Sequence, residues 1–266
     1  MLGPLGPVCR LGLATRGNTQ LAATDVLHAL DLGLNYWNWC GYPDGMSEAV
    51  RRLGTRRGEV VLATQLNARD ARGARLELDR LLGHLQTDYL DVVTHYYLET
   101  AQEWRTIRAT DGAATALDEA RRAGRVRAVG ITSHQRPLAA RIARQRATEL
   151  LMIRYNAAHR GAERAIFPQA QAARLPVVAY TAVRWGALLS PTPDDPPGFV
   201  LPTAAECYRW VLDQEAVDVV LMAPDGRTEL DENLAALRTW RPLDADRHAE
   251  LAAHGARVRR YAGQFP

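Results

Sequence analysis

The sequence predicts an α/β fold and, within that class, a (β/α)8 TIM barrel. Eight short apolar runs rich in β-branched residues alternate with amphipathic stretches along its 266 residues. Eight strand–helix units in a chain of this length have the size and rhythm of such a barrel. The alternative is a doubly wound open sheet, but the segment after the first run reads GLATRG and lacks the GxGxxG spacing. We therefore expect residues 1–266 to form one barrel domain.

Strands are expected where a short apolar run stands before a turn signal. They are predicted at Val8–Ala14, Leu34–Asn38, Val60–Gln65, Tyr89–His95, Val126–Thr132, Leu151–Asn156, Pro176–Thr181 and Val217–Met222. Each run is followed by a pattern with helical period. Helices are predicted at Thr24–Leu32, Ser47–Leu53, Arg72–Leu85, Ala114–Ala123, Leu138–Arg144, Glu163–Ala173, Thr203–Gln214 and Leu230–Arg238.

Local signals support this order of elements. Gly33 ends the first helix and Gly124 the fourth, where a residue in the left-handed region commonly closes a helix. Leu78, Leu81 and Leu85 form part of the apolar stripe of the third helix. The Pro-rich stretch 190–202 lies between the seventh strand and its helix, so it is interpreted as a loop on the active face.

Composition excludes several partners and locations. The 33 basic and 30 acidic residues give a net charge of +3 with no basic block, so neither nucleic acid nor a membrane is expected as a partner. No apolar run approaches the ~20 residues of a membrane helix, and the start of the chain does not resemble a secretory signal. Cys9, Cys40 and Cys207 form no CxxC pair, which indicates neither a disulfide framework nor a zinc site. A cytoplasmic protein is expected.

All 33 basic residues are arginine, and the chain contains no lysine. Schiff-base enzymes, lysine aldolases and P-loop kinases are therefore excluded, because each needs a lysine amine. The scattered histidines His28, His84, His159, His248 and His254 share no spacing, so no metal site is expected.

Polar residues end most of the predicted strands. They are Asn38, Gln65, His95, Thr132, Ser133, Asn156 and Tyr180. In (β/α)8 barrels the chemistry takes place at the carboxyl ends of the strands. A polar residue also commonly marks the exit of a strand into a loop, but seven of them around one barrel favour a shared pocket.

Six stretches, from Leu11 to about Leu237, resemble the aldo-keto reductase family in the family's order. They read GLNYWNWCGYPDGMSEAVRRLG, VVLATQ, RLLGHLQTDYLDVVTHYY, AGRVRAVGITSH, PVVAYTAVRWGALL and VDVVLMAPDGRTELDENLAAL. The resemblance implies a barrel that reduces aldehydes and ketones with NADPH. It implies a tyrosine proton donor next to a Lys–Asp pair, a histidine that orients the substrate, and an aromatic residue under the nicotinamide. A cation is needed because the pKa of free tyrosine lies near ~10.

The resemblance assigns the catalytic positions to Tyr42, His95, Asn38 and Gln65. Tyr42 matches the proton donor with altered spacing: one residue short from Asn38 and two residues long to Ser47. Asn38 stands in place of the family's Asp, and Gln65 in place of its Lys. This paired loss is physically coherent, because two neutral amides can hydrogen-bond, whereas a buried Asp without its Lys would cost several kcal/mol.

The resemblance also assigns cofactor contacts, and some of them are altered. The predicted cofactor-binding residues are Thr132, Ser133, Tyr180, Arg184, Glu232 and Asn233. Met152 falls on a carboxamide-binding Gln of the family. Glu229 replaces the basic residue for the 2′-phosphate, and Ala223 and Pro224 occupy the other phosphate-binding positions. Since a carboxylate repels a phosphate, we expect NAD(P)(H) without preference for the 2′-phosphate, although Arg227 lies nearby.

Trp37 and Trp39 flank Asn38. Because side chains alternate along a strand, both tryptophans should face away from Asn38 and pack against the helices.

Three hypotheses remain open. The first is an oxidoreductase that binds a nicotinamide cofactor and a small carbonyl or alcohol substrate, with weak ordinary carbonyl reduction. The second is the same barrel used for non-redox acid–base chemistry, such as a lyase, dehydratase or isomerase that employs His95 and Tyr42. The third is a catalytically silent member that binds a ligand or partner.

Overall fold

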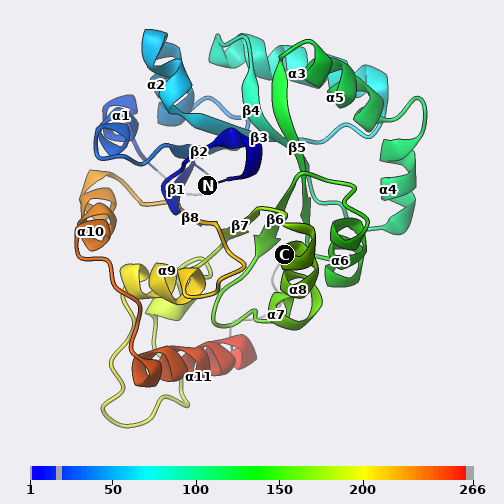
Figure 1. Ribbon diagram of the computed structural model, residues 1–266. Coiled ribbons are helices and arrows are strands. Elements are labelled where there is room, and N and C mark those ends of the chain that lie inside the picture. The colour runs from blue at the N-terminus through cyan, green and yellow to red at the C-terminus, as the bar shows by residue number, and fades with distance from the viewer. Residues whose placement is uncertain (1, 16–19, 262–266) are drawn as a thin grey trace.

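In the residues that the structure describes, eight parallel strands close into a barrel in chain order (Figure 1). The structure is a computed structural model, and it describes residues 2–15 and 20–261. The strands are β1 (Leu11–Thr15), β2 (Tyr36–Trp39), β3 (Val61–Leu66), β4 (Leu90–His95), β5 (Val126–Ser133), β6 (Leu150–Arg154), β7 (Val177–Tyr180) and β8 (Val219–Met222). Each lies within a few residues of a predicted run, and β8 pairs with β1 to close the barrel. The predicted (β/α)8 fold is confirmed.

Helices surround the barrel, as Figure 1 shows. They are α1 (Ala23–Asp31), α2 (Gly45–Arg52), α3 (Ala71–Leu85), α4 (Ala101–Arg108), α5 (Ala113–Arg122), α6 (Arg136–Arg144), α7 (Ala162–Ala165), α8 (Phe167–Ala173), α9 (Ala204–Leu212), α10 (Arg227–Arg238) and α11 (Ala245–Tyr261). Short 3-10 turns occur at η1 (Gly3–Leu5), η2 (Gly54–Glu59) and η3 (Ala187–Leu189). Helices α4 and α11 were not predicted from the sequence. The predicted sixth helix is divided into α7 and α8.

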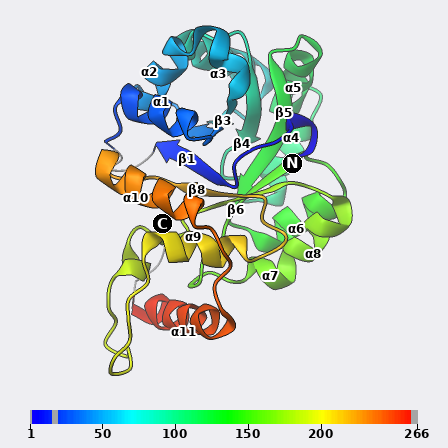
Figure 2. The same ribbon diagram turned by 60° about the vertical axis from the view of Figure 1, so that its left-hand side comes forward.

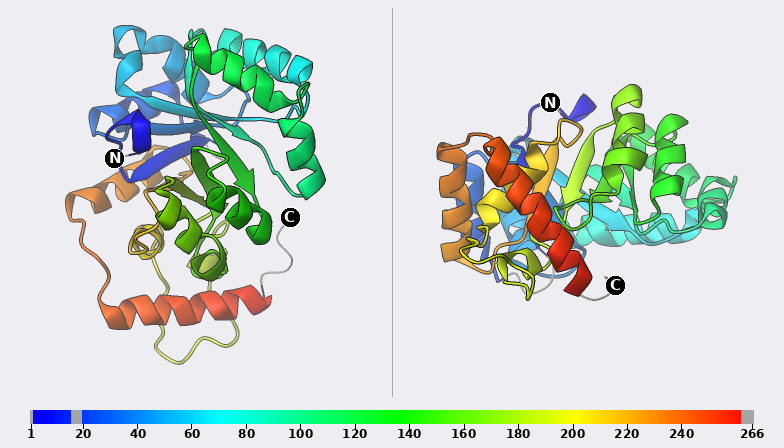
Figure 3. Two further views of the ribbon diagram at one scale, coloured as in Figure 1. Left: turned by 45° about the vertical axis from the view of Figure 1, so that its right-hand side comes forward. Right: turned by 90° about the horizontal axis from the view of Figure 1, so that it is seen from below.

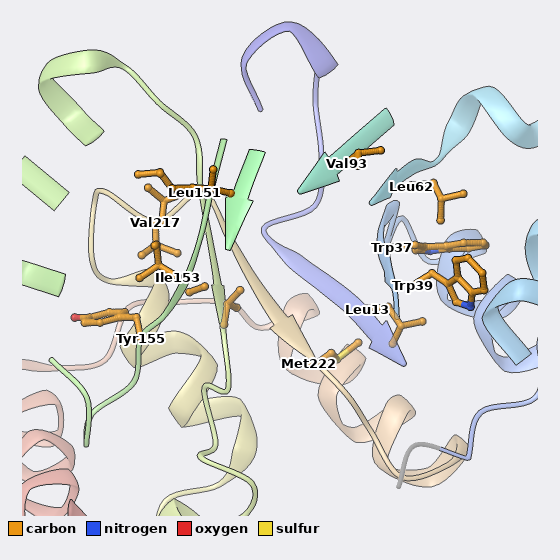
Figure 4. Packing of buried hydrophobic residues seen from close by; sticks show 14 of the residues in the cluster. Leu13, Trp37, Trp39, Leu62, Val93, Leu151, Ile153, Tyr155, Val217 and Met222 are labelled. Atoms are coloured by element: carbon orange, nitrogen blue, oxygen red, sulfur yellow. The ribbon is translucent and has the colours of Figure 1, made fainter. Parts of the chain in front are cut away.

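The strands divide the apolar residues into two cores. Tyr36, Ala63, Val92 and Met152 belong to the cluster inside the barrel, which Leu2 and Leu5 join. The larger cluster lies between the strands and the helices, and Figure 4 shows its side chains around Trp37 and Trp39. Both tryptophans are fully buried there, as predicted. The indole N–H of Trp37 donates to the carbonyl of Leu34 at 3.0 Å, and that of Trp39 to the carbonyl of Tyr42 at 2.7 Å.

Helix α11 packs outside α9 and η3, at the lower end of the molecule in Figure 2 and in the left view of Figure 3. His254 of this helix is fully buried, with Nδ1 3.0 Å from Asp195 Oδ1 and Nε2 3.1 Å from the carbonyl oxygen of Leu188. Arg257 Nε donates to the same carboxylate at 2.6 Å. Burial alone would raise the pKa of Asp195, but hydrogen bonds from Thr192, Arg257 and His254 lower it below its usual range. The Pro-rich loop after β7 is thus anchored to α11.

The contact between α11 and the loop after β6 generates a stability prediction. A Cβ added to Gly255 would lie 2.3 Å from the backbone carbon and oxygen of Ala157. Gly255→Ala should therefore lower the free energy of unfolding by about 1–3 kcal/mol through overpacking, although alanine favours a helix. The control is Gly83→Ala in α3, where nothing lies within 4 Å of the new methyl group. It should stabilise the protein by up to about 1 kcal/mol. Urea unfolding measures both, and a Gly255→Ala protein as stable as the wild type would contradict the packing of α11.

Candidate functional site

A cavity of about 290 Å³ lies at the carboxyl ends of the strands. Its volume is at the lower end of the range of small-molecule sites, about 300–1,000 Å³. From the strands it is lined by Ala14, Asn38, Gln65, Thr132, Met152, Tyr180, Leu221 and Met222. From the following segments it is lined by Cys40, Tyr96, Tyr97, Thr181, Ala182, Val183, Trp185, Gly186, Leu189, Tyr208, Ala223, Asp225 and Glu229. Of the seven polar strand-end residues expected to share one pocket, Asn38, Gln65, Thr132 and Tyr180 line this cavity, whereas His95, Ser133 and Asn156 do not.

The floor of this cavity contains a pair of neutral amides. Gln65 Nε2 donates to Asn38 Oδ1 at 2.7 Å, so the predicted hydrogen bond between these two residues is present. Gln65 Nε2 also lies 3.9 Å from the sulfur of Met152, and Asn38 Nδ2 lies 3.7 Å from Cys40 Sγ. Asn38 is 2% exposed. The amides satisfy each other in a largely apolar surrounding, where a lone charge would be costly.

Tyr42 does not line this cavity, and 73% of its surface is exposed. Its position follows from the turn between β2 and α2. Gly41 adopts φ +87°, and Asp44 then caps α2 by accepting the N–H of Ser47 at 2.8 Å. The carbonyl of Tyr42 is held by the indole of Trp39. These contacts fix the backbone and direct the phenol to the outside.

His95 lies on the outer face of β4, because it alternates with Val92 and Thr94. It is paired in register with Leu66 of the outer core, is 2% exposed, and meets the ring of Trp104 edge-on at a centroid distance of 6.4 Å. Burial, followed by the charge of Arg69, lowers the pKa of His95 to about 4. The structure therefore does not bring His95 to the cavity.

Tyr96 and Tyr97 are the residues of this segment that line the cavity, and the sequence reasoning missed both. The signal was available: counting two residues at a time from Val92 through Thr94 leads to position 96, not 95. The ring of Tyr96 stacks on Tyr97 at 3.9 Å, and Tyr97 meets His134 at 4.5 Å. Tyr96 and Tyr97 thus form an aromatic wall on one side of the cavity, and His134 packs against Tyr97.

Tyr180 continues this wall from β7, with its ring 6.2 Å from that of His134. Burial raises the pKa of Tyr180 well above its usual value. Among the described residues, its hydroxyl has no hydrogen-bond partner. A buried donor without a partner, on the wall of a cavity, is a natural contact for a ligand.

The other polar strand ends divide between the cavity and structural roles. Thr132 lines the cavity, and its hydroxyl lies 3.1 Å from that of Thr94. Ser133 is on the opposite face and accepts the N–H of Gln135 at 3.0 Å. Asn156, fully buried, donates to the carbonyl of Thr181 at 2.8 Å and accepts the N–H of Ala158 at 3.0 Å. Ser133 and Asn156 therefore hold loops and do not line the cavity.

At the β8 side the cavity wall carries a negative charge. Glu229 lines the wall and accepts the N–H of Asp225. Arg227 points to other carboxylates, with Nε 2.8 Å from Asp231 Oδ2 and Nη1 3.4 Å from Asp25 Oδ1. The guanidinium of Arg227 is thus paired with Asp231 and Asp25 on the protein surface, while the carboxylate of Glu229 lines the cavity.

The remaining predicted cofactor residues lie around this region. Glu232 is exposed on α10, and Asn233 is 3% exposed. Within the part of the chain that the structure describes, Asn233 Nδ2 has no hydrogen-bond partner. Arg184 is 5% exposed and does not itself line the cavity, although Val183 and Trp185 do. Burial, followed by the charge of Arg154, lowers the pKa of Arg184.

Two kinds of feature are absent from the described residues. No group of three or more His, Cys, Asp or Glu is arranged there to hold a metal ion. None of the helices described combines the length and the apolar character that crossing a membrane requires.

Comparisons with known proteins agree with the fold. A model of the aldo/keto reductase family matches residues 10–199. The holo form of aldo-keto reductase AKR11C1 from Bacillus halodurans is 21% identical, with a TM-score of 0.76 over 96% of this chain and 94% of that one. Its apo form is 20% identical, with a TM-score of 0.73 over 93% and 92% of the two chains. No curated protein sequence gives a significant match.

The amide pair on the cavity floor generates a coupling prediction. Gln65→Lys alone would place a cation beside Asn38 without a carboxylate, and Asn38→Asp alone would bury an unpaired anion. Each single change should lower the free energy of unfolding by about 1–3 kcal/mol. The double change restores an ion pair, so the coupling should be about 0.5–3 kcal/mol. A double-mutant cycle by denaturant unfolding measures this, and strict additivity would show that the two side chains do not meet.

The buried imidazole of His95 generates a pH prediction. Its pKa is about 4 in the folded chain against an ordinary value of 6.5, so the unfolded chain binds the proton more tightly. The contribution of His95 to the free energy of unfolding is fully present above pH 6.5. As the pH falls from 6.5 towards 4, the free energy of unfolding decreases by up to about 3 kcal/mol. His95→Gln should remove this part of the dependence of the unfolding free energy on pH. Urea unfolding at several pH values tests it, and an unchanged slope in the variant would argue against the buried, neutral histidine.

Proposed function

Because the chain belongs to the aldo-keto reductase family, we propose that it is a nicotinamide-dependent oxidoreductase that acts slowly on a small carbonyl or alcohol substrate. The observation that carries this proposal is the cavity at the carboxyl ends of the strands, with the Asn38–Gln65 pair on its floor and Tyr180 on its wall. Family membership supports an oxidoreductase, and the altered floor supports the slow rate.

The residues present fit a nicotinamide dinucleotide. The Tyr180 hydroxyl and the Asn233 amide are buried donors without partners among the described residues, which a bound cofactor would satisfy. Tyr180 would support the nicotinamide, Thr132 its carboxamide and Asn233 the adenine, as the family resemblance predicts. Arg184 and Glu232 stay predicted contacts, whereas the Ser133 hydroxyl already holds the loop through Gln135. When bound, the cofactor supplies a hydride.

The protein's own groups donate hydrogen bonds to a substrate oxygen, but offer no positive charge on the cavity floor. Gln65 has a second amide hydrogen beyond the one it gives to Asn38, with the sulfur of Met152 3.9 Å from its Nε2, and Tyr96 lines the cavity from the turn after β4. We assign these two groups to the substrate oxygen. A neutral amide stabilises a developing phenolate less than a lysine does, so proton transfer should limit turnover. Tyr42 and His95 keep the predicted catalytic assignment only if they move from their present positions.

A second candidate function is a silent barrel that binds a ligand without turnover. The exposure of Tyr42 and the outward position of His95 favour it, because both acid–base groups of the family pattern lie away from the cavity. Non-redox acid–base chemistry with these same two residues would require both to reach the cavity.

Glu229 generates a prediction for cofactor choice. Its carboxylate is on the cavity wall and should repel a 2′-phosphate, so NADH and NADPH should bind with similar dissociation constants. Glu229→Gln should shift the preference towards NADPH, by up to about tenfold or 1.4 kcal/mol. The control Glu215→Gln, exposed after α9, should change neither constant. Calorimetric titration measures both, and a clear NADPH preference in the wild type would refute the role of Glu229.

The same titration separates the two candidate functions. Binding of either dinucleotide, with aldehyde turnover below the usual range of roughly 1 to 1,000 per second, supports the slow oxidoreductase. The absence of any dinucleotide binding would overturn it in favour of the silent barrel.

A further inference from the structure

Cys40 brings a thiol to the cavity from the turn after β2. Side chains alternate along a strand, so Asn38 and Cys40 face the same side, while Trp39 between them is buried in the outer core. Asn38 and Cys40 both line the cavity, and Cys40 is half-buried there. The carbonyl chemistry proposed above does not use its sulfur.

The amide pair on the floor directs an N–H group at this sulfur. Asn38 Oδ1 accepts the N–H of Gln65 at 2.7 Å, so the nitrogen of the same amide group points the other way. This nitrogen, Asn38 Nδ2, lies 3.7 Å from Cys40 Sγ. A hydrogen bond to the charged form of a group favours that form, and the thiolate is the form of cysteine that attacks an electrophile. Asn38 thus links the sulfur to the amide of Gln65.

The other two cysteines lie outside the cavity. Cys207 is 4% exposed, and burial raises the pKa of its thiol to about 12. Cys9 packs against the outer core, and burial raises the pKa of its thiol as well. The chain contains no lysine, so no side-chain amine competes for a carbonyl compound. Cys40 is therefore the thiol that a molecule inside the cavity meets.

A second, independent observation indicates that the cavity accepts a polar ligand. Tyr180 lines it and is 9% exposed, and among the described residues its hydroxyl has no hydrogen-bond partner. A buried polar atom without a partner is unfavourable, and a bound polar group would remove this cost. Gln65 has a second amide hydrogen, whose printed neighbour is the weakly accepting sulfur of Met152 at 3.9 Å. The cavity thus combines donors for a carbonyl oxygen with a nucleophilic sulfur.

We propose that Cys40 is a covalent modification site for small α,β-unsaturated aldehydes and ketones. The carbonyl oxygen accepts a hydrogen bond from the Gln65 amide, which draws electron density away from the β-carbon. A bond then forms between Cys40 Sγ and the β-carbon. The π electrons of the double bond move towards the oxygen, and the thiol proton ends on the α-carbon. The product is a saturated carbonyl compound joined to Cys40 by a thioether, and the addition consumes no oxidant or reductant.

The adduct would close the cavity to other ligands. The cavity volume is about 290 Å³, so an attached carbonyl compound takes up much of the space that a substrate needs. The inference goes beyond the proposed oxidoreductase, because the addition needs neither a hydride nor a dinucleotide.

The modification test uses but-2-enal and the full chain without dinucleotide. Borohydride reduction fixes the adducts, and peptide mass spectrometry then gives the rate at each cysteine. Cys40 should react at least about tenfold faster than Cys9, and Cys207 should stay unmodified. Cys40→Ser should remove the fast adduct, whereas the matched control Cys9→Ser should leave the rate at Cys40 unchanged. Butanal, which has no double bond to attack, should modify none of the cysteines.

A second measurement separates recognition of the carbonyl group from mere access to the thiol. Gln65→Met should slow the reaction of Cys40 with but-2-enal several-fold, because the donor to the carbonyl oxygen is lost. The same variant should react at the wild-type rate with methyl methanethiosulfonate, a small thiol reagent that has no carbonyl group.

Two results would decide against the modification site. Equal rates at Cys40 and Cys9 in the wild type overturn it without any variant, so misfolding of Gln65→Met would not protect it. An unchanged but-2-enal rate in Gln65→Met, or an equal slowing with both reagents, would overturn the recognition of a carbonyl group. Fast modification of Cys40 in a protein that binds no dinucleotide supports the site and refutes only the oxidoreductase. Dinucleotide binding with an unreactive Cys40 refutes only the modification site.

Discussion

The alternation of side chains in a closed barrel is the constraint on which the site depends. A strand residue faces either the barrel interior or the helices, and a shift of one position reverses the direction. Asn38 faces inward because Trp37 and Trp39 fill the outer core on either side of it. The same rule places His95 against Trp104 and brings the following tyrosine, Tyr96, to the cavity. Packing of the outer core thus decides which polar groups can meet a ligand.

The amide pair of Asn38 and Gln65 changes the electrostatics of the floor without a loss of packing. A hydrogen bond of 2.7 Å joins the two side chains, so each amide group has the other as its hydrogen-bond partner. Replacing an ion pair by neutral groups of similar size is often neutral for stability. Replacing the family's lysine by Gln65 would nevertheless remove the cation that lowers the pKa of a phenol. Stability and chemistry are therefore separable here, which is why a well-formed barrel can coexist with slow carbonyl chemistry.

The sequence predicted the strands and the amide pair because those depend on local apolar runs and on pairwise chemistry. It missed α11, whose buried face consists of Leu251, His254, Gly255 and Val258 and therefore shows little apolar period. It could not place Tyr42, since the direction of that side chain depends on the turn after β2 and not on strand alternation.

The charge on the cavity lining lies on the β8 side. Asp225 and Glu229 are the charged residues among those that line the cavity, and the floor formed by Asn38 and Gln65 is neutral. In a cavity with low-dielectric walls, charges placed on one side act on a ligand before any contact forms. A dinucleotide without a 2′-phosphate would tolerate this side, whereas an added phosphate would be repelled. The substitutions that remove charge from the floor therefore leave the β8 side as the part of the lining that discriminates between ligands by charge.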